Sequence, residues 1–135
     1  MSKNLFFCII MFFACTKSNN NQVKTSILFN QKVHDFSKIS TDKPSEYKFV
    51  FYNSGKAPLT LNDVKPSCGC TAAEWTKNPI LHGDSGYIKV NFHVTFSEVF
   101  NKEIKVFYNG ADSPVTLNIK GEVQINDSIK NKSEI

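Results

Sequence analysis

Apolar and polar residues alternate one by one through the middle of the chain, and this period of two constrains the fold more than any other feature. Strict alternation puts the apolar side chains on one face of an extended strand. Turn-forming sequences such as Asn53-Ser54-Gly55 and Asn109-Gly110 separate the alternating stretches, and no segment shows a helical stripe. The expected strands cover residues 46–51, 87–93, 104–108 and 115–123, with shorter ones at 26–29, 33–39, 59–64 and 71–75. Seven or eight short strands without helices predict an all-β fold, an antiparallel β-sandwich.

The charge of the chain argues against nucleic acid as a partner. The formal net charge is only +4, and the basic residues are scattered and not gathered into a patch. Every basic residue is a lysine, so the chain has no guanidinium fork for paired hydrogen bonds to phosphate or carboxylate. A dedicated site for an anionic ligand is not expected.

The N-terminus has the layout of an export signal. An apolar run from Leu5 to Ala14 follows Lys3; it is too short to cross a bilayer as a helix. Phe12-Phe13-Ala14-Cys15 resembles the lipobox of bacterial lipoproteins, and the resemblance implies that Cys15 carries the lipid. We therefore expect a lipoprotein signal peptide at 1–14, a lipidated tether at 15–22, a sandwich at 23–123 and a polar, disordered tail at 124–135. The alternatives are an uncleaved anchor and a cleaved soluble protein.

Two cysteines one residue apart, Cys68 and Cys70, are the most distinctive chemical feature. A turn at Gly69 would bring them within disulfide distance, and an oxidising compartment favours that bond. They could instead be free thiols packed beside Trp75, or thiolates for redox chemistry or a soft metal such as Cu(I). Two thiolates fill only half of a four-coordinate zinc site.

The other candidate residues are histidines and two phenylalanines. His93 alternates with polar neighbours and is expected to face solvent, whereas His34 is expected to make a local polar contact beside Asp35. No nucleophile, base and orienting group are arranged in a known catalytic motif, so no catalytic residue and no cofactor are predicted. Phe96 and Phe100 flank a predicted turn. There they either fold back onto the sandwich, which the rarity of exposed apolar patches favours, or form an exposed contact for a protein partner.

A set of short motifs extends from about residue 33 to 123: His34-Asp35-Phe36, Phe51-Tyr52-Asn53-Ser54-Gly55, Ala57-Pro58-Leu59, Val64-Lys65-Pro66-Ser67-Cys68-Gly69-Cys70-Thr71, Trp75, Pro79-Ile80, Gly83, Ile88-Lys89-Val90 and Ile119-Lys120-Gly121-Glu122-Val123. In these motifs the chain resembles the bacterial domain-of-unknown-function family 1573, a group of immunoglobulin-like, Hydin-related domains. The resemblance implies an immunoglobulin-like sandwich and brings no established activity. Ser37 replaces a usual glycine, and His82 a usual proline; His82 could join Cys68 and Cys70 at a metal.

Together these features predict a lipid-anchored module of the bacterial cell envelope, facing the periplasm or the exterior. The module is expected to be non-catalytic and to act by binding a protein partner or by structural support. The alternative function is a thiol-redox or copper-handling accessory protein that uses Cys68 and Cys70.

Overall fold

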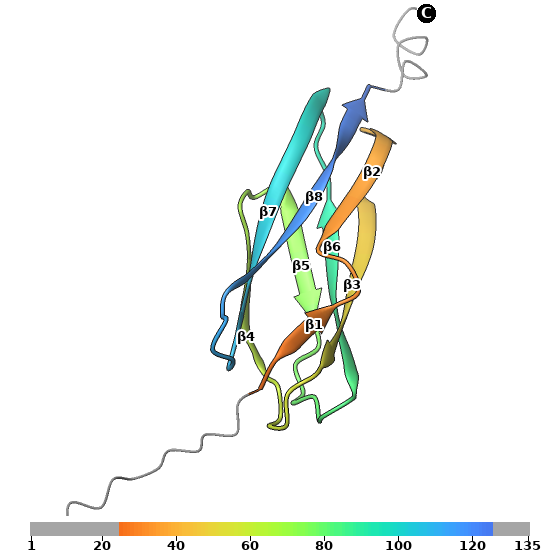
Figure 1. Cartoon of the computed structure of the whole chain (residues 1–135). Coiled ribbons are helices and arrows are strands. Elements are labelled where there is room, and N and C mark those ends of the chain that lie inside the picture. The colour runs from red at the N-terminus through yellow and green to blue at the C-terminus, as the bar shows by residue number, and fades with distance from the viewer. Residues whose placement is uncertain (1–24, 126–135) are drawn as a thin grey trace, which may run out of the picture.

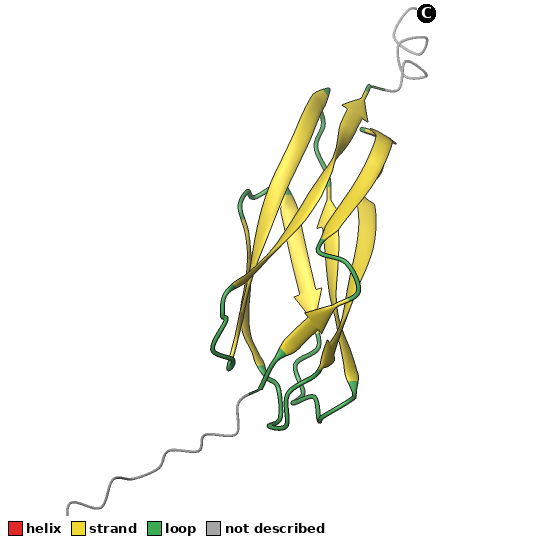
Figure 2. Cartoon of the chain, viewed as in Figure 1, coloured by secondary structure: helices red, strands yellow, loops and turns green. Residues whose placement is uncertain are grey.

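The computed structural model describes residues 25–125, which form eight strands and no helix (Figures 1 and 2). The strands are β1 (Ile27–Phe29), β2 (Val33–Ser40), β3 (Ser45–Asn53), β4 (Leu61–Pro66), β5 (Thr71–Trp75), β6 (Ser85–Phe92), β7 (Glu98–Tyr108) and β8 (Val115–Gln124). They build two four-stranded sheets, in the orders β1-β3-β6-β5 and β2-β8-β7-β4. The predicted all-β sandwich is confirmed.

One strand pair departs from the expected antiparallel arrangement. β2 pairs with β8 in parallel, while the other strand pairs among residues 25–125 are antiparallel. The reason is that the chain leaves β1 in the first sheet and enters β2 in the second sheet after only three residues, 30–32. β2 therefore lies beside β8, the last strand, and runs in the same direction (Figure 1).

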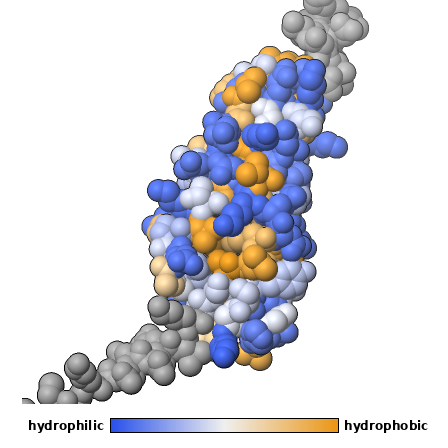
Figure 3. Space-filling view, viewed as in Figure 1, coloured by the Kyte–Doolittle hydropathy of each residue, from blue (hydrophilic) through white to orange (hydrophobic). Residues whose placement is uncertain are grey.

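The core lies between the two sheets and is made by the apolar members of the alternating strands. Phe49 and Phe51 of β3, Ile88 and Val90 of β6, and Leu117 of β8 are completely buried. Burial of each such side chain contributes roughly 1.5–3 kcal/mol. The polar members of the same strands face outward, so the visible face is largely hydrophilic, with separate hydrophobic patches (Figure 3).

A buried asparagine fastens the turn after β3. The side chain of Asn53 is fully buried, and its Nδ2 donates to the carbonyls of Ala57 (2.7 Å) and Ile80 (2.8 Å). Its Oδ1 accepts from the amide of Gly55 at 2.9 Å and from the hydroxyl of Thr25 at 3.3 Å. A buried amide is tolerated only when its hydrogen bonds are made, and this one ties together three segments distant in sequence.

The strand boundaries correct the predictions at several places. β4, predicted at residues 59–64, covers Leu61–Pro66. β7 begins at Glu98, six residues before the predicted strand, and β8 includes Gln124, which was predicted to begin the tail. The predicted signal peptide, the tether with Cys15, and the tail from residue 126 lie outside the described residues. In residues 25–125 no helix is long and apolar enough to cross a membrane.

Candidate functional site

The strongest candidate site is the turn between β4 and β5, where Cys68 and Cys70 form a disulfide with their Cα atoms 5.3 Å apart. β4 and β5 are edge strands of opposite sheets, so the turn carries the chain across one side of the sandwich. The amide of Thr71 donates to the carbonyl of Cys68 at 3.4 Å and closes the turn. Gly69 at its tip is exposed, and a Cβ there would meet no atom within 4 Å.

Neighbouring strands hold both ends of this turn. The amide of Ser67 donates to the carbonyl of Glu103 at 2.8 Å, and the Ser67 hydroxyl accepts from the amide of Glu103 at 3.1 Å. The carbonyl of Cys70 accepts from the amide of His93 at 3.0 Å. Cys68 Sγ lies 3.5 Å from the Thr71 hydroxyl, while Cys70 packs against the core. The sulfurs are therefore half-buried on a firmly anchored turn.

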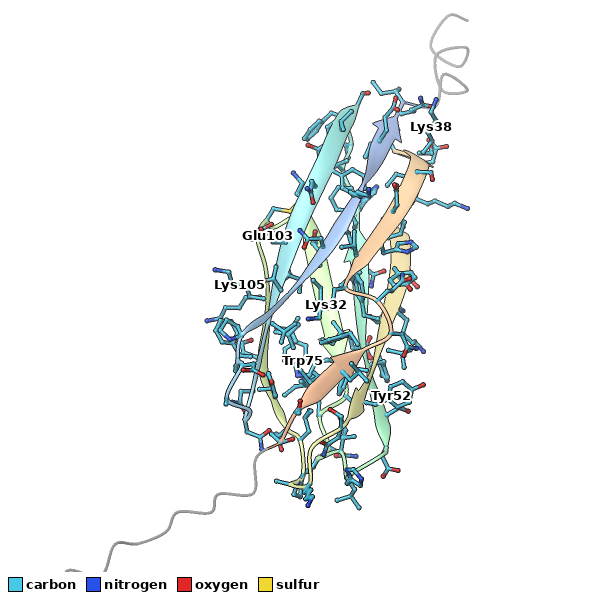
Figure 4. All side chains as sticks on the ribbon, viewed as in Figure 1. Lys32, Lys38, Tyr52, Trp75, Glu103 and Lys105 are labelled. Carbon is cyan, nitrogen blue, oxygen red and sulfur yellow. A yellow bond between two sulfur atoms is a disulfide. The ribbon has the colours of Figure 1, made fainter. Side chains whose placement is uncertain are left out.

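Trp75, at the other end of β5, packs against the core and not against the cysteines (Figure 4). The ammonium of Lys77 lies over the indole ring, 3.0 Å from its centroid. This is a cation–π contact, in which the electron-rich ring face attracts the positive charge. The indole Nε1 is buried and has no hydrogen-bond partner among the residues that the structure describes.

The structure contradicts a metal site made by Cys68, Cys70 and His82. The cysteines lie by His93, just after β6, whereas His82 precedes the start of β6. The two groups are thus at opposite ends of a strand that runs from Ser85 to Phe92. His82 Nδ1 makes a 2.8 Å hydrogen bond with the carbonyl of Gly55. Across residues 25–125 no three His, Cys, Asp or Glu side chains are grouped to hold a metal.

The two phenylalanines proposed as a partner contact lie in different surroundings. Phe100 is 3% exposed and stacks on Phe92 with the ring centroids 4.1 Å apart, so its proposed role as a surface contact is wrong. It is buried because it belongs to β7, whose alternation places Val99 outward and Phe100 inward. Phe96 precedes the strand and is 57% exposed, so it stays available at the surface.

Two further histidines make structural contacts. His34 stacks on Tyr47 with the ring centroids 3.5 Å apart, joining β2 to β3 across the sandwich, and partial burial lowers the pKa of His34. His93 is exposed, as predicted, and its Nε2 makes a 3.2 Å hydrogen bond with the carbonyl of Thr41. The aromatic stack was not predicted, since His34 was expected to make only a local polar contact.

The bulge in β2 is the most unusual piece of backbone. Ser37 has φ = 56°, a conformation that is costly for residues other than glycine. Its amide donates to Asp35 Oδ1 at 2.7 Å. This hydrogen bond, with a smaller effect from Lys120, lowers the pKa of Asp35. Lys120 Nζ lies 3.5 Å from the other carboxylate oxygen of Asp35.

The fold is an immunoglobulin-like β-sandwich. The domain titled PapD-like domain 7 of human CEP192 is similar with a TM-score of 0.57 and 10% identity, covering 77% of this chain and 87% of that one. A protein of unknown function from Porphyromonas gingivalis has a TM-score of 0.59 and 15% identity, covering 75% of this chain. The secreted serine protease VesC of Vibrio cholerae has a TM-score of 0.54 and 15% identity, covering 76% of this chain.

The chain belongs to the family described as protein of unknown function (DUF1573), whose model matches residues 27–123. Comparison with curated proteins gives no match. The matched part spans 46% of the Porphyromonas protein and 23% of VesC. At these identities the structural likenesses establish the fold, while the family model establishes membership.

Proposed function

We propose that this protein is a cell-envelope lipoprotein, anchored through lipid on Cys15, whose sandwich is a non-catalytic module for binding or structural support. One observation carries the proposal for the module: among residues 25–125 the three histidines and the buried Asn53 make contacts that hold the fold. Asn53 and His82 bind backbone carbonyls of one turn, His93 binds the carbonyl of Thr41, and His34 stacks on Tyr47. The outer faces and sheet edges are left for contacts with other molecules.

Anchoring is tested by replacing the residue that would carry the lipid. For Cys15→Ser, in cells where another peptidase still removes the signal peptide, we expect the protein to move from the membrane fraction to the soluble exported fraction, because the acyl chains would be lost. Cys8→Ser is the matched control, since that cysteine would leave with the signal peptide, and it should stay with the membranes. An unmodified Cys15 thiol in the intact mass of the mature protein would contradict the proposal.

A second candidate function is thiol-redox or copper chemistry at the Cys68–Cys70 turn. The observation in its favour is that the half-buried disulfide lies beside an exposed turn tip, Gly69, with the Thr71 hydroxyl 3.5 Å from Cys68 Sγ. Two-electron reduction by an external thiol, which is itself oxidised to a disulfide, would give two adjacent thiols, and their deprotonated forms are suitable ligands for Cu(I). The two functions differ in one experiment: Cys68→Ser/Cys70→Ser should keep partner binding if the module is a binder, and should abolish Cu(I) or thiol-exchange activity if the second function is correct.

A further inference from the structure

Three large apolar side chains are exposed at the end of the sandwich where the described chain begins. They are Leu28 (59% exposed), Tyr52 (39%) and Leu81 (60%). Leu28 of β1 lies directly opposite Tyr52 of β3 in the strand register, so the two side chains are neighbours on the outer face of their sheet. Figure 4 shows Tyr52 in the half of the sandwich that lies toward this end.

The turn that carries Leu81 is fixed beside Tyr52 by backbone hydrogen bonds. The amide of Gly83 donates to the carbonyl of Asn53 at 2.8 Å, and the amide of Asn53 donates to the carbonyl of Asp84 at 3.0 Å. The amide of Asp84 donates to the carbonyl of Leu81 at 3.0 Å and closes the turn. Because Asn53 directly follows Tyr52, the three apolar side chains belong to one rigid end of the molecule.

The charged side chains at this end do not favour a ligand of one sign. The end is formed by the loops 54–60 and 76–84 (Figure 1). Lys56 and Asp84 are exposed in these loops and have opposite charges, while the ammonium of Lys77 lies over an indole ring. The surface therefore offers apolar contact without a strong electrostatic preference.

The position of Cys15 identifies the surface that this end can reach. Thr25 is buried, and its hydroxyl donates to Asn53 Oδ1 at 3.3 Å, so the chain enters the sandwich here (Figure 1). Cys15 lies ten positions earlier. A ten-residue segment spans at most about 35 Å, or roughly 17 Å on average when flexible. A lipid on Cys15 would therefore hold this end of the sandwich close to the bilayer.

We infer that this end of the sandwich docks on the membrane surface, with Leu28, Tyr52 and Leu81 at the boundary between lipid headgroups and acyl chains. Tyrosine suits that boundary, because its ring is apolar while its hydroxyl stays hydrated. Three apolar side chains bind a bilayer weakly by themselves, but a short tether keeps the local concentration high enough to populate a weak contact. The inference rests on the proposed anchoring and deepens it by naming the surface that faces lipid.

The test is NMR of the full chain with Cys8→Ser, coupled through Cys15 to a maleimide lipid in phosphatidylcholine nanodiscs that also contain a gadolinium-chelating lipid. Chemical coupling supplies the anchor, so docking is measured whether or not cells acylate Cys15. We expect the strongest paramagnetic relaxation at the amides of residues 26–28, 52–56 and 81–84, and little at residues 96–99. Because the contact is apolar, it should form without anionic lipid.

Two leucine substitutions separate docking from simple proximity to the anchor. Leu28→Ser/Leu81→Ser leaves the tether unchanged and should lower the ratio of docked to undocked protein about tenfold or more, because apolar burial is lost. Phe96→Ser/Val99→Ser is the matched control. Both side chains are at least as exposed as Tyr52 but lie at the other end of the sandwich, so the ratio should not change. The solution spectrum of each variant checks that it is folded.

Relaxation spread evenly over the sandwich, or strongest near residues 96–99, would overturn the inference. An effect that Leu28→Ser/Leu81→Ser leaves unchanged, or that appears only after anionic phosphatidylglycerol is added, would also overturn it. The intact mass of the cellular protein reports separately on Cys15. Failure of docking with lipid found on Cys15 would overturn this inference alone, whereas an unmodified Cys15 would overturn the anchoring on which it rests.

Discussion

At the scale of single residues, the fold depends on a few polar groups in demanding positions. Asn53 is fully buried and serves four hydrogen-bond partners, and Ser37 holds a left-handed backbone conformation at the bulge of β2. Both positions lie in recognisable sequence motifs. The Asn-Ser-Gly segment was predicted as a turn, and the family resemblance implied a glycine at the position of Ser37. The hydrogen bond from Asn53 to the distant carbonyl of Ile80 could not be predicted, because no sequence pattern links the two residues.

Replacing Asn53 should be among the most damaging single changes. For Asn53→Ala we expect a loss of about 3 kcal/mol or more in the free energy of unfolding, because buried partners are left unpaired. Asn109→Ala is the matched control: Asn109 also bonds two backbone groups, those of Pro58 and Thr60, but at an exposed site. Its loss should be at most about 1.5 kcal/mol. Urea unfolding measures both, and equal losses would contradict the role given to Asn53.

The effect of a substitution at Ser37 on the stability of the fold should depend on how easily the new residue adopts a positive φ, and not on the size of its side chain. Ser37→Gly should be neutral or stabilising by up to about 1 kcal/mol, because glycine adopts positive φ without strain. Ser37→Val should destabilise by about 1 kcal/mol or more, since a β-branched residue is poorly accommodated there. Thermal unfolding ranks the variants. A valine variant as stable as the glycine variant would show that the bulge is not strained.

The bulge should also respond to acid. The pKa of Asp35 is lowered in the fold, chiefly by the hydrogen bond from the Ser37 amide. A carboxyl with a lowered folded-state pKa contributes stability that is present above its unfolded pKa and is lost as the pH falls through the folded value. We therefore expect the bulge to loosen only below the ordinary aspartate range. NMR titration of the Asp35 carboxyl and the Ser37 amide should show coincident midpoints, and a midpoint above the ordinary value would contradict the account.

At the scale of elements, the strands were predictable and their partners were not. Strict alternation located four of the eight strands, β3, β6, β7 and β8, because it reports which residues face a core. The other four were predicted only as shorter candidate strands, and the structure has a strand at each of them. Strict alternation missed the beginning of β7, since polar residues around Ser97 and Glu98 resemble a turn while Val99 faces outward and Phe100 inward. Alternation also carries no information on which sheet a strand joins. The parallel pairing of β2 with β8 therefore emerged only in the structure.

The disulfide turn should matter locally and little globally. Cys68 and Cys70 are separated by two positions, so their bond closes almost no loop in the unfolded chain, and loop closure is what sets the entropic gain. We expect Cys68→Ser/Cys70→Ser to lower the free energy of unfolding by about 1 kcal/mol or less. Hydrogen exchange should rise between residues 67 and 75 and stay unchanged in β3. Global unfolding of the double variant would contradict this local role.

At the scale of the whole molecule, the described chain begins and ends at opposite ends of the sandwich (Figure 1). The first sheet-switching strand, β2, and the last strand, β8, lie side by side and run in the same direction. Tension applied to the two ends of the described chain would pull β2 and β8 past each other along their length, so their shared hydrogen bonds would be loaded together in shear and not opened one after another. The sandwich is thus suited to carry mechanical load from one of its ends to the other.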